Sequence, residues 1–180
     1  MITLVSASNR NKSLTHLFTH YVSNYLKEKK GEEVQLLDLQ DLSPIKICKA
    51  MYEPGFESPE IEALKEKFFL PVQKFWFFIP EYNGSFPGIL KLLLDIMSTQ
   101  KREETFSGKK ACLTGIASGR AGNLRGMDHF AEILNHLNIA VLPHKLPISS
   151  IHTLIDQNKK LIDIKTRDCL HHQADQFISF

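Results

Sequence analysis

Short apolar segments alternate with longer segments of helical periodicity along the whole chain, and this alternation constrains the fold more than any other feature. The most apolar segment is Lys74–Pro80, whose consecutive aromatic residues are typical of a central strand covered on both faces. Further strands are expected at Ile2–Ser6, Val34–Leu39, Ala111–Ile116 and Ile139–Leu142. Helices between successive strands act as right-handed crossovers, so the pattern predicts an α/β protein with a parallel sheet.

The helical segments complete this arrangement. They are expected at Ser13–Lys30, Glu60–Phe69, Pro87–Ser98, Gly122–Leu137 and Lys159–Phe180. Five strands with these helices fit a flavodoxin-like, doubly wound five-stranded parallel sheet of order 2-1-3-4-5 in a three-layer α/β/α arrangement. We find no repeat and no linker, so residues 1–180 are expected to form a single domain. Ligands of this fold bind beyond the carboxyl ends of the strands, which directs attention to the loops there.

Composition excludes several classes of partner. The net charge is only +2 and no basic stripe is interleaved with aromatic residues, which argues against nucleic acid as a partner. No run of about 18 apolar residues is present, so no membrane span is expected. The three cysteines, Cys48, Cys112 and Cys169, stand far apart and the N-terminus lacks a signal-peptide pattern. Both features favour a reducing compartment, and we expect the protein to be cytoplasmic.

The loop after the first strand is rich in hydroxyl groups and runs directly into a helix. The free N–H groups and positive dipole end of a helix start favour a phosphate. Hydroxyls of Ser8, Ser13 and Thr15 are suited to donate to its oxygens, and Arg10 adds a charged fork. The loop matches neither the Walker A nor the GxGxxG pattern, which argues against nucleoside triphosphates and firmly bound dinucleotides. A plain serine-capped helix is the alternative.

The loop after the third expected strand carries the second polar cluster. Residues 80–91 read PEYNGSFPGILK, so polar groups, an aromatic ring and two glycines directly follow the most buried strand. Gly84 permits a tight turn whose exposed backbone groups could contact the edge of a flat heterocycle. The alternative is an ordinary turn followed by a helix cap at Ser85.

Residues 80–91 resemble the central signature of the NADPH-dependent FMN reductase family, which also includes chromate-, quinone- and azo-dye-reducing enzymes. Residues 7–15, ASNRNKSLT, resemble the phosphate segment of that family, and residues 117–125, ASGRAGNLR, resemble its third flavin-flanking loop. Two positions depart from the family pattern, since Ala7 replaces a glycine and Thr15 replaces an asparagine. The resemblance extends from the first strand to about Leu142.

The resemblance implies a site for flavin mononucleotide (FMN) on three loops. The residues implied at the phosphate are Ser8, Arg10, Ser13 and Thr15, and Leu14 beside them is also implied to bind the cofactor. Those implied along the isoalloxazine ring are Pro80, Glu81, Tyr82, Asn83 and Gly84, with Ser118 and Gly119 on its other flank. The activity implied is an oxidoreductase that passes a hydride from NADPH or NADH through FMN to a flavin, quinone or similar small acceptor. Because the flavin carries the chemistry, no acid–base side chain is expected.

Two other functions stay open at this stage. A flavodoxin-type electron carrier would share the fold, although such carriers are typically acidic and this chain is slightly basic. A flavin-free binding module is the other, if the Ala7 methyl group blocks the phosphate. The two helical histidine sets, His16 with His20 and His129 with His136, lack further ligands at metal spacing, so no metal site is expected.

The helix expected at Pro87–Ser98 has few polar positions. This composition, together with the family resemblance, predicts a homodimer or homotetramer that buries part of the helix. Burial of the same helix inside one subunit is the alternative.

Overall fold

The computed structural model describes residues 1–42, 51–53, 55, 56 and 58–180, so Cys48 lies outside the described residues. The strands are β1 (Ile2–Ser6), β2 (Val34–Asp38), β3 (Lys74–Pro80), β4 (Lys110–Ile116), β5 (Ala140–Val141) and β6 (Leu146–Ile148). The helices are α1 (Leu14–Lys30), α3 (Pro59–Phe68), α4 (Gly88–Met97), α5 (Arg102–Phe106), α6 (Leu124–His136) and α7 (Ile164–Ser179), with short 3-10 turns η1 (Leu39–Asp41) and η2 (Ile151–Thr153).

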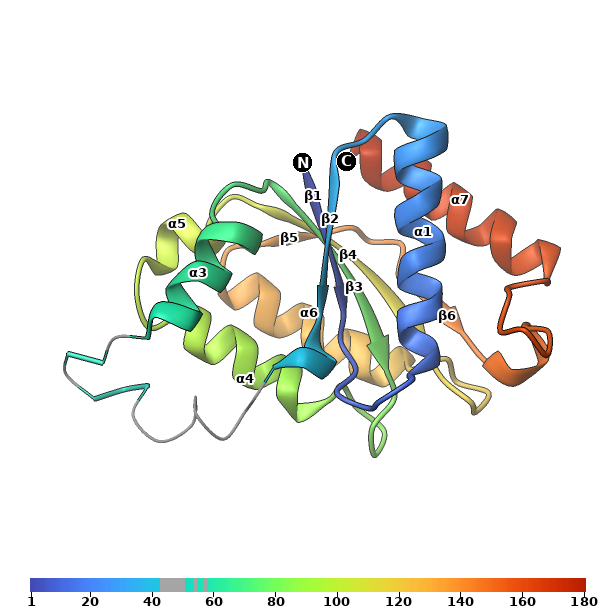
Figure 1. Cartoon of the computed structure of the whole chain (residues 1–180), viewed down its shortest axis with the longest axis horizontal. Coiled ribbons are helices and arrows are strands. Elements are labelled where there is room, and N and C mark those ends of the chain that lie inside the picture. Colours follow the sequence, from blue (N-terminus) through green and yellow to red (C-terminus); the bar gives the residue numbers. More distant parts are fainter. Residues whose placement is uncertain (43–50, 54, 57) are drawn as a thin grey trace.

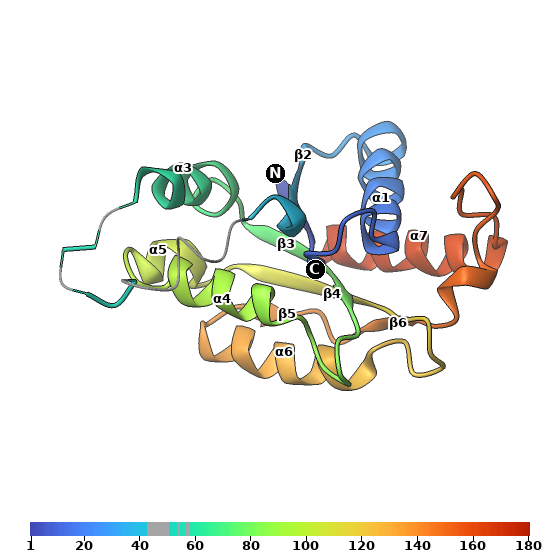
Figure 2. The ribbon, with the colours of Figure 1, turned by 60° about the horizontal axis from the view of Figure 1, so that its bottom comes forward.

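The strands form one parallel sheet in the order β2-β1-β3-β4-β5, which confirms the expected doubly wound order (Figure 1). Helices α1 and α7 pack on one face, and α4 and α6 pack on the other (Figure 2). Side chains of β3 alternate between the two resulting cores: Phe75 and Phe77 join the α4–α6 core, whereas Trp76 and Phe78 join the α1–α7 core. A central strand with two buried faces therefore needs an unbroken apolar sequence.

The expectation of five strands is wrong at the sheet edge next to β4. The segment expected at Ile139–Leu142 pairs with β4 only over β5, and a further strand, β6, pairs with the later part of β4. Pro143 follows the first of these segments and has no N–H group for a ladder bond. Within the described residues the sheet therefore has six strands, and two short strands share one neighbour.

A side chain from α7 fills the gap between β5 and β6. Gln173 is fully buried, and its Nε2 donates to the carbonyl oxygens of Leu113 at 2.9 Å and His144 at 3.0 Å. Its Oε1 accepts from the Thr114 hydroxyl at 2.8 Å, and that hydroxyl accepts from Trp76 Nε1 at 2.8 Å. The glutamine thus satisfies backbone groups that a continuous fifth strand would have paired.

The helices differ most from the expectations at two places. Helix α5 was not expected, because five residues are too few to show an apolar period. The last helix begins at Ile164 instead of Lys159, where Asp163 accepts from Thr166 N at 2.7 Å as its N-cap. Leu161, which lies inside the expected helix, instead forms an antiparallel bridge with Ile155, so the residues before Asp163 are not helical.

The apolar positions of α4 face the core of the same subunit. Ile89, Leu90, Leu93, Leu94, Ile96 and Met97 are all buried there. The composition of α4 is therefore explained without a partner, and the predicted assembly stays a prediction. No helix in the described parts of the chain is long and apolar enough to cross a membrane.

One buried lysine makes the stability dependent on pH. Lys109 precedes β4, is only 3% exposed, and its Nζ donates to the carbonyl oxygen of Phe69. Burial lowers the pKa of Lys109 from 10.5 to about 8. The native protein therefore releases this proton near pH 8, while the unfolded chain keeps it until about pH 10.5. Because the unfolded state binds more protons between these values, the unfolding free energy rises with pH in this window.

Comparison with Lys109→Met isolates this effect, because other titrating groups cancel in the difference. The wild type is expected to gain about 2–3 kcal/mol relative to the variant between about pH 7 and about pH 10. Urea unfolding at several pH values measures the gain, and Lys29→Met, at an exposed position, controls for the loss of one lysine. A constant difference across this range would show that the ammonium group stays charged in its buried position.

Candidate functional site

A cavity of about 580 Å³ lies beyond the carboxyl ends of β1, β3 and β4. The residues selected from the sequence that line it are Ser8, Arg10, Ser13, Leu14, Thr15, Pro80, Glu81, Tyr82, Asn83, Gly84, Ser118 and Gly119. The structure thus brings all twelve together, and their contact with a ligand stays a prediction. Six further residues complete the wall: Asn11, Lys12, Ile116, Ala117, Ile151 and His152.

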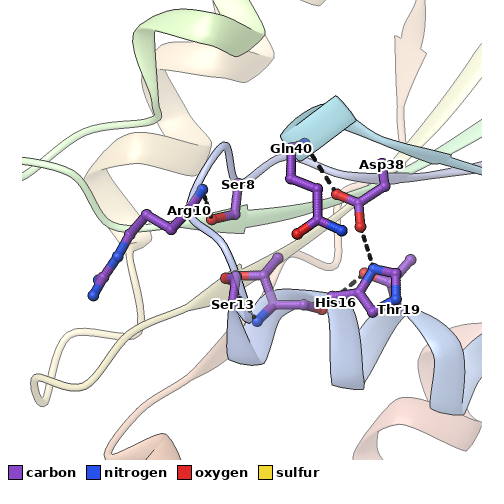
Figure 3. Close-up of polar contacts among 8 residues, drawn as sticks. Ser8, Arg10, Ser13, His16, Thr19, Asp38 and Gln40 are labelled. Carbon is purple, nitrogen blue, oxygen red and sulfur yellow. Dashed lines mark hydrogen bonds and ion pairs between the residues drawn. The ribbon is translucent and has the colours of Figure 1, made fainter. Parts of the chain in front are cut away.

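The first loop leads into α1 through two local hydrogen bonds. Ser13 is the N-cap, and its Oγ accepts from Thr15 N at 3.2 Å. Ser8 Oγ accepts from Arg10 N at 3.2 Å (Figure 3). Ser8 and Thr15 are almost fully buried, although both line the cavity. The start of α1 therefore offers backbone N–H groups without helical partners beside buried hydroxyls, a combination suited to an anion.

Arg10 is placed differently from the hydroxyl groups. Its side chain is exposed and extends away from Ser8 and Ser13 in Figure 3, while still forming part of the cavity wall. The guanidinium group consequently stands at the rim, from which a rotation of the long side chain is needed to reach a ligand at the helix start.

The second loop is a tight turn at the end of β3. Tyr82 and Ser85 exchange backbone hydrogen bonds of 2.9 and 3.0 Å, and the central residues Asn83 and Gly84 have φ angles of 51° and 77°. Two central residues with positive φ define a type I′ turn, for which Asn-Gly is the preferred sequence. The turn's own bonds use the N–H groups of Tyr82 and Ser85, so the N–H groups of Asn83 and Gly84 remain available to a ligand.

The alternative of a helix cap at Ser85 is wrong. Helix α4 has Pro87 at its N-cap position, without a side-chain capping bond. Ser85 Oγ instead lies 3.0 Å from His129 Nδ1 on α6, which fixes the turn to that helix.

Hydrogen bonds outside the strands hold the loops in register. Ala7 N donates to Phe78 O and Glu81 N donates to Ile116 O, both at 3.0 Å, so pairing continues past the named strands. Ser8 Oγ lies 3.1 Å from the Tyr82 hydroxyl and links the first loop to the second. The cavity walls are therefore preorganised by the sheet.

A fourth wall was missed from the sequence. Ile151 and His152 belong to η2, which follows β6, a strand that the sequence did not reveal. Ser150 N donates to Gly119 O at 3.1 Å, and Ile151 N donates to Ala117 O at 3.3 Å. The wall thus depends on the third loop, and the Ser149-Ser150 pair after an apolar strand is the signal that could have indicated it.

Close packing positions the start of α6 beside the second loop. Asn123 is buried and donates from Nδ2 to Ile79 O at 3.0 Å and to Pro80 O at 3.1 Å. Gly126 approaches the Ser85 backbone so closely that an added Cβ would lie 2.7 Å from the Ser85 carbonyl carbon. The end of β3 and the turn that follows are consequently fixed from outside the cavity.

Comparison with known proteins places this arrangement in a family. The model of NADPH-dependent FMN reductases matches residues 1–153. An NAD(P)H-dependent FMN reductase of Pseudomonas aeruginosa is 32% identical over 139 residues, which cover 76% of this chain and 74% of that protein. A 2-hydroxy-1,4-benzoquinone reductase of Burkholderia sp is 24% identical over 144 residues, covering 79% of this chain and 78% of that protein.

Solved structures agree at the level of the fold. FerB, an NAD(P)H:acceptor oxidoreductase flavoenzyme from Paracoccus denitrificans, superposes with a TM-score of 0.77 at 23% identity, covering 99% of this chain and 94% of that chain. The apo form of an NADH:FMN oxidoreductase superposes with a TM-score of 0.74 at 17% identity, covering 98% and 87%. With the sequence match spanning all three strand-end loops of the cavity, the chain belongs to the NADPH-dependent FMN reductase family.

Proposed function

We propose that this protein binds FMN in the cavity and works as an NAD(P)H-dependent oxidoreductase that passes a hydride through FMN to a small acceptor such as a flavin or quinone. The observation that carries the proposal is the convergence of the three loops on one cavity of about 580 Å³. This volume lies within the range of small-molecule sites. The family of the chain supports the same conclusion.

The residues at the start of α1 fit the phosphate of FMN. Ser8 and Thr15 present buried hydroxyls beside the helix N-terminus, and Arg10 and Lys12 supply positive charge at the wall. Ala7 does not obstruct this end, because its side chain belongs to the same hydrophobic core as Val5 and does not line the cavity. This placement removes the main argument for a flavin-free module.

The opposite end of the cavity fits a flat ring. The N–H groups of Asn83 and Gly84 can donate to ring heteroatoms, while Ile116, Ala117 and Ile151 supply apolar contact. When bound, FMN accepts a hydride and passes electrons on, and the protein supplies its placement and the surrounding polarity. Tyr82 contributes by position, since its hydroxyl is held by Ser8 at 3.1 Å.

Steady-state kinetics test the proposed reaction. NADPH or NADH and a quinone acceptor are expected to use the same open side of the cavity in turn. Initial rates at several fixed acceptor concentrations should therefore give parallel double-reciprocal lines, as for other two-step transfers with an intermediate carrier. Under anaerobic conditions, NADPH or NADH alone should remove the visible absorbance of the bound flavin.

Three results would contradict the proposal, and the first two separate its alternatives. If the purified protein holds flavin and this flavin stays oxidised under excess NADPH and NADH, the protein is an electron carrier. A protein that binds no FMN when the cofactor is added would be a binding module of another kind. Intersecting lines would require both substrates in the cavity together.

The domain organisation, the assembly and the cellular location of the protein are further predictions. We propose residues 1–180 as one domain, a homodimer or homotetramer, and residence in the cytoplasm. The last is supported by the sparse cysteines, of which Cys112 and Cys169 are both free.

A further inference from the structure

A carboxylate lies beside the helix start that the proposed function assigns to phosphate. Asp38 ends β2, and its Cα is paired across the sheet with that of Ser6, which ends β1. Its side chain is only 8% exposed. Asp38 is therefore a poorly solvated anion one strand away from the first loop, and it does not line the cavity.

Each oxygen of this carboxylate has one polar neighbour, as Figure 3 shows. Oδ1 accepts from Gln40 N at 3.2 Å. Oδ2 contacts Nδ1 of His16, which lies in the first turn of α1 directly after the cavity residue Thr15. The His16 side chain is 36% exposed, so it forms the solvent side of the contact.

A second histidine, His20, lies close to the His16–Asp38 contact. The His20 ring lies 4.2 Å from that of His16 between centroids, and burial, together with the nearby His16, lowers the pKa of His20. The charge of Asp38 acts in the opposite direction and raises the pKa of His20. Among the described residues around the first turn of α1, His16 is the group that contacts Oδ2 of the carboxylate.

The charge of Asp38 stabilises the start of α1 when no ligand is bound, and it opposes the binding of a phosphate there. A carboxylate near a helix N-terminus interacts favourably with the dipole. A phosphate dianion at the same helix start would be repelled by it, and burial limits the screening of that repulsion. When protonated, the His16 imidazole offsets the charge of Asp38 across this contact and so reduces the repulsion.

We propose that the His16–Asp38 pair sets how strongly this site discriminates FMN from riboflavin. Asp38 weakens the binding of the phosphorylated flavin, and His16 offsets that effect. Both act through the start of α1 without touching the ligand, so they are specificity-determining positioning residues. The inference rests on the proposed function, since it assumes that the flavin phosphate lies at the start of α1.

Titration of apoprotein with FMN and with riboflavin tests the pair. Asp38→Asn keeps the acceptor for Gln40 N but removes the charge, so it should raise the FMN-to-riboflavin affinity ratio by about three- to tenfold. His16→Ala uncovers the charge and should lower the ratio by a similar factor. The double variant should return the ratio to the wild-type value or above. Asp41→Asn, at an exposed carboxylate in η1, is the matched control and should leave the ratio unchanged.

The sign of the Asp38→Asn effect distinguishes this role from a structural one. Loss of a merely structural contact would weaken both flavins equally, and an unchanged or lowered ratio in Asp38→Asn would overturn the inference. His16→Ala provides an independent arm at a partly exposed position, outside both hydrophobic cores. Wild-type protein that binds neither FMN nor inorganic phosphate would overturn the proposed function as well. Wild-type protein that binds FMN, with ratios unaffected by either variant, would overturn the pair alone.

Discussion

Riboflavin is expected to bind the apoprotein at least about 100-fold more weakly than FMN, because it lacks the group that the start of α1 would hold. Charge-assisted hydrogen bonds contribute about 1.5–3 kcal/mol each, so the loss of two already gives this factor. The donors in question are the buried hydroxyls of Ser8 and Thr15 and the first N–H groups of α1. Quenching of flavin fluorescence at constant ionic strength measures both affinities.

Arg10→Ala tests the charged part of the same loop. The variant should bind FMN about 1.5–3 kcal/mol more weakly, provided that the side chain rotates from the rim to the phosphate. Asn9→Ala is a matched control, since Asn9 is exposed in the same loop but does not line the cavity.

The riboflavin comparison decides about the loop as a whole. Equal affinities of the wild-type apoprotein for riboflavin and FMN would reject the assignment of this loop to phosphate.

The Gly115→Ala variant should lose about 3 kcal/mol or more of unfolding free energy. A Cβ at Gly115 would lie 2.1 Å from the carbonyl oxygen of Gly122, far inside van der Waals contact. The obstacle is backbone, and Gly122 itself is held against Pro147, so neither side can withdraw easily. Chemical denaturation followed by circular dichroism measures the loss.

A second glycine provides the control for this prediction. Gly88 has no atom within 4 Å of an added Cβ and no positive φ angle, so Gly88→Ala should be neutral or slightly stabilising. If Gly115→Ala unfolds at the wild-type denaturant concentration, the turn at Gly122 can move, and the third loop is less rigid than the structure indicates.

The sheet order could be predicted because it depends on local information and on handedness. Each of the first four strands carries its own apolar pattern, and right-handed crossovers leave few ways to connect them. Pro143 marks locally where pairing of the first segment stops, but the resumption of pairing as β6 could not be predicted in this way. It depends on Gln173, which is distant in sequence and satisfies Leu113 and His144 only after α7 has packed.

The site shows the same division between local and tertiary information. The hydroxyl-rich helix start and the Asn83-Gly84 turn are short sequence patterns with direct structural meaning. The contact of His16 with Asp38 joins a helix to a strand through the register of β2 on β1, which no sequence spacing expresses. The spacing of His16 and His20 therefore suggests only a metal ligand to a reader of the sequence, and it does not indicate the role that we propose for His16 beside the first loop.

The short strands at the β5–β6 edge also affect how separate molecules meet in solution. Open strand edges are templates on which a second chain can add a strand and begin an aggregate. Here the edge consists of strands of two and three residues, and Pro143 and Pro147 each lack an N–H group. Such an edge offers too few consecutive N–H donors for a strand of a second chain to pair with it. The interruption between β5 and β6, whose backbone groups Gln173 satisfies, therefore also disfavours aggregation at this edge of the sheet.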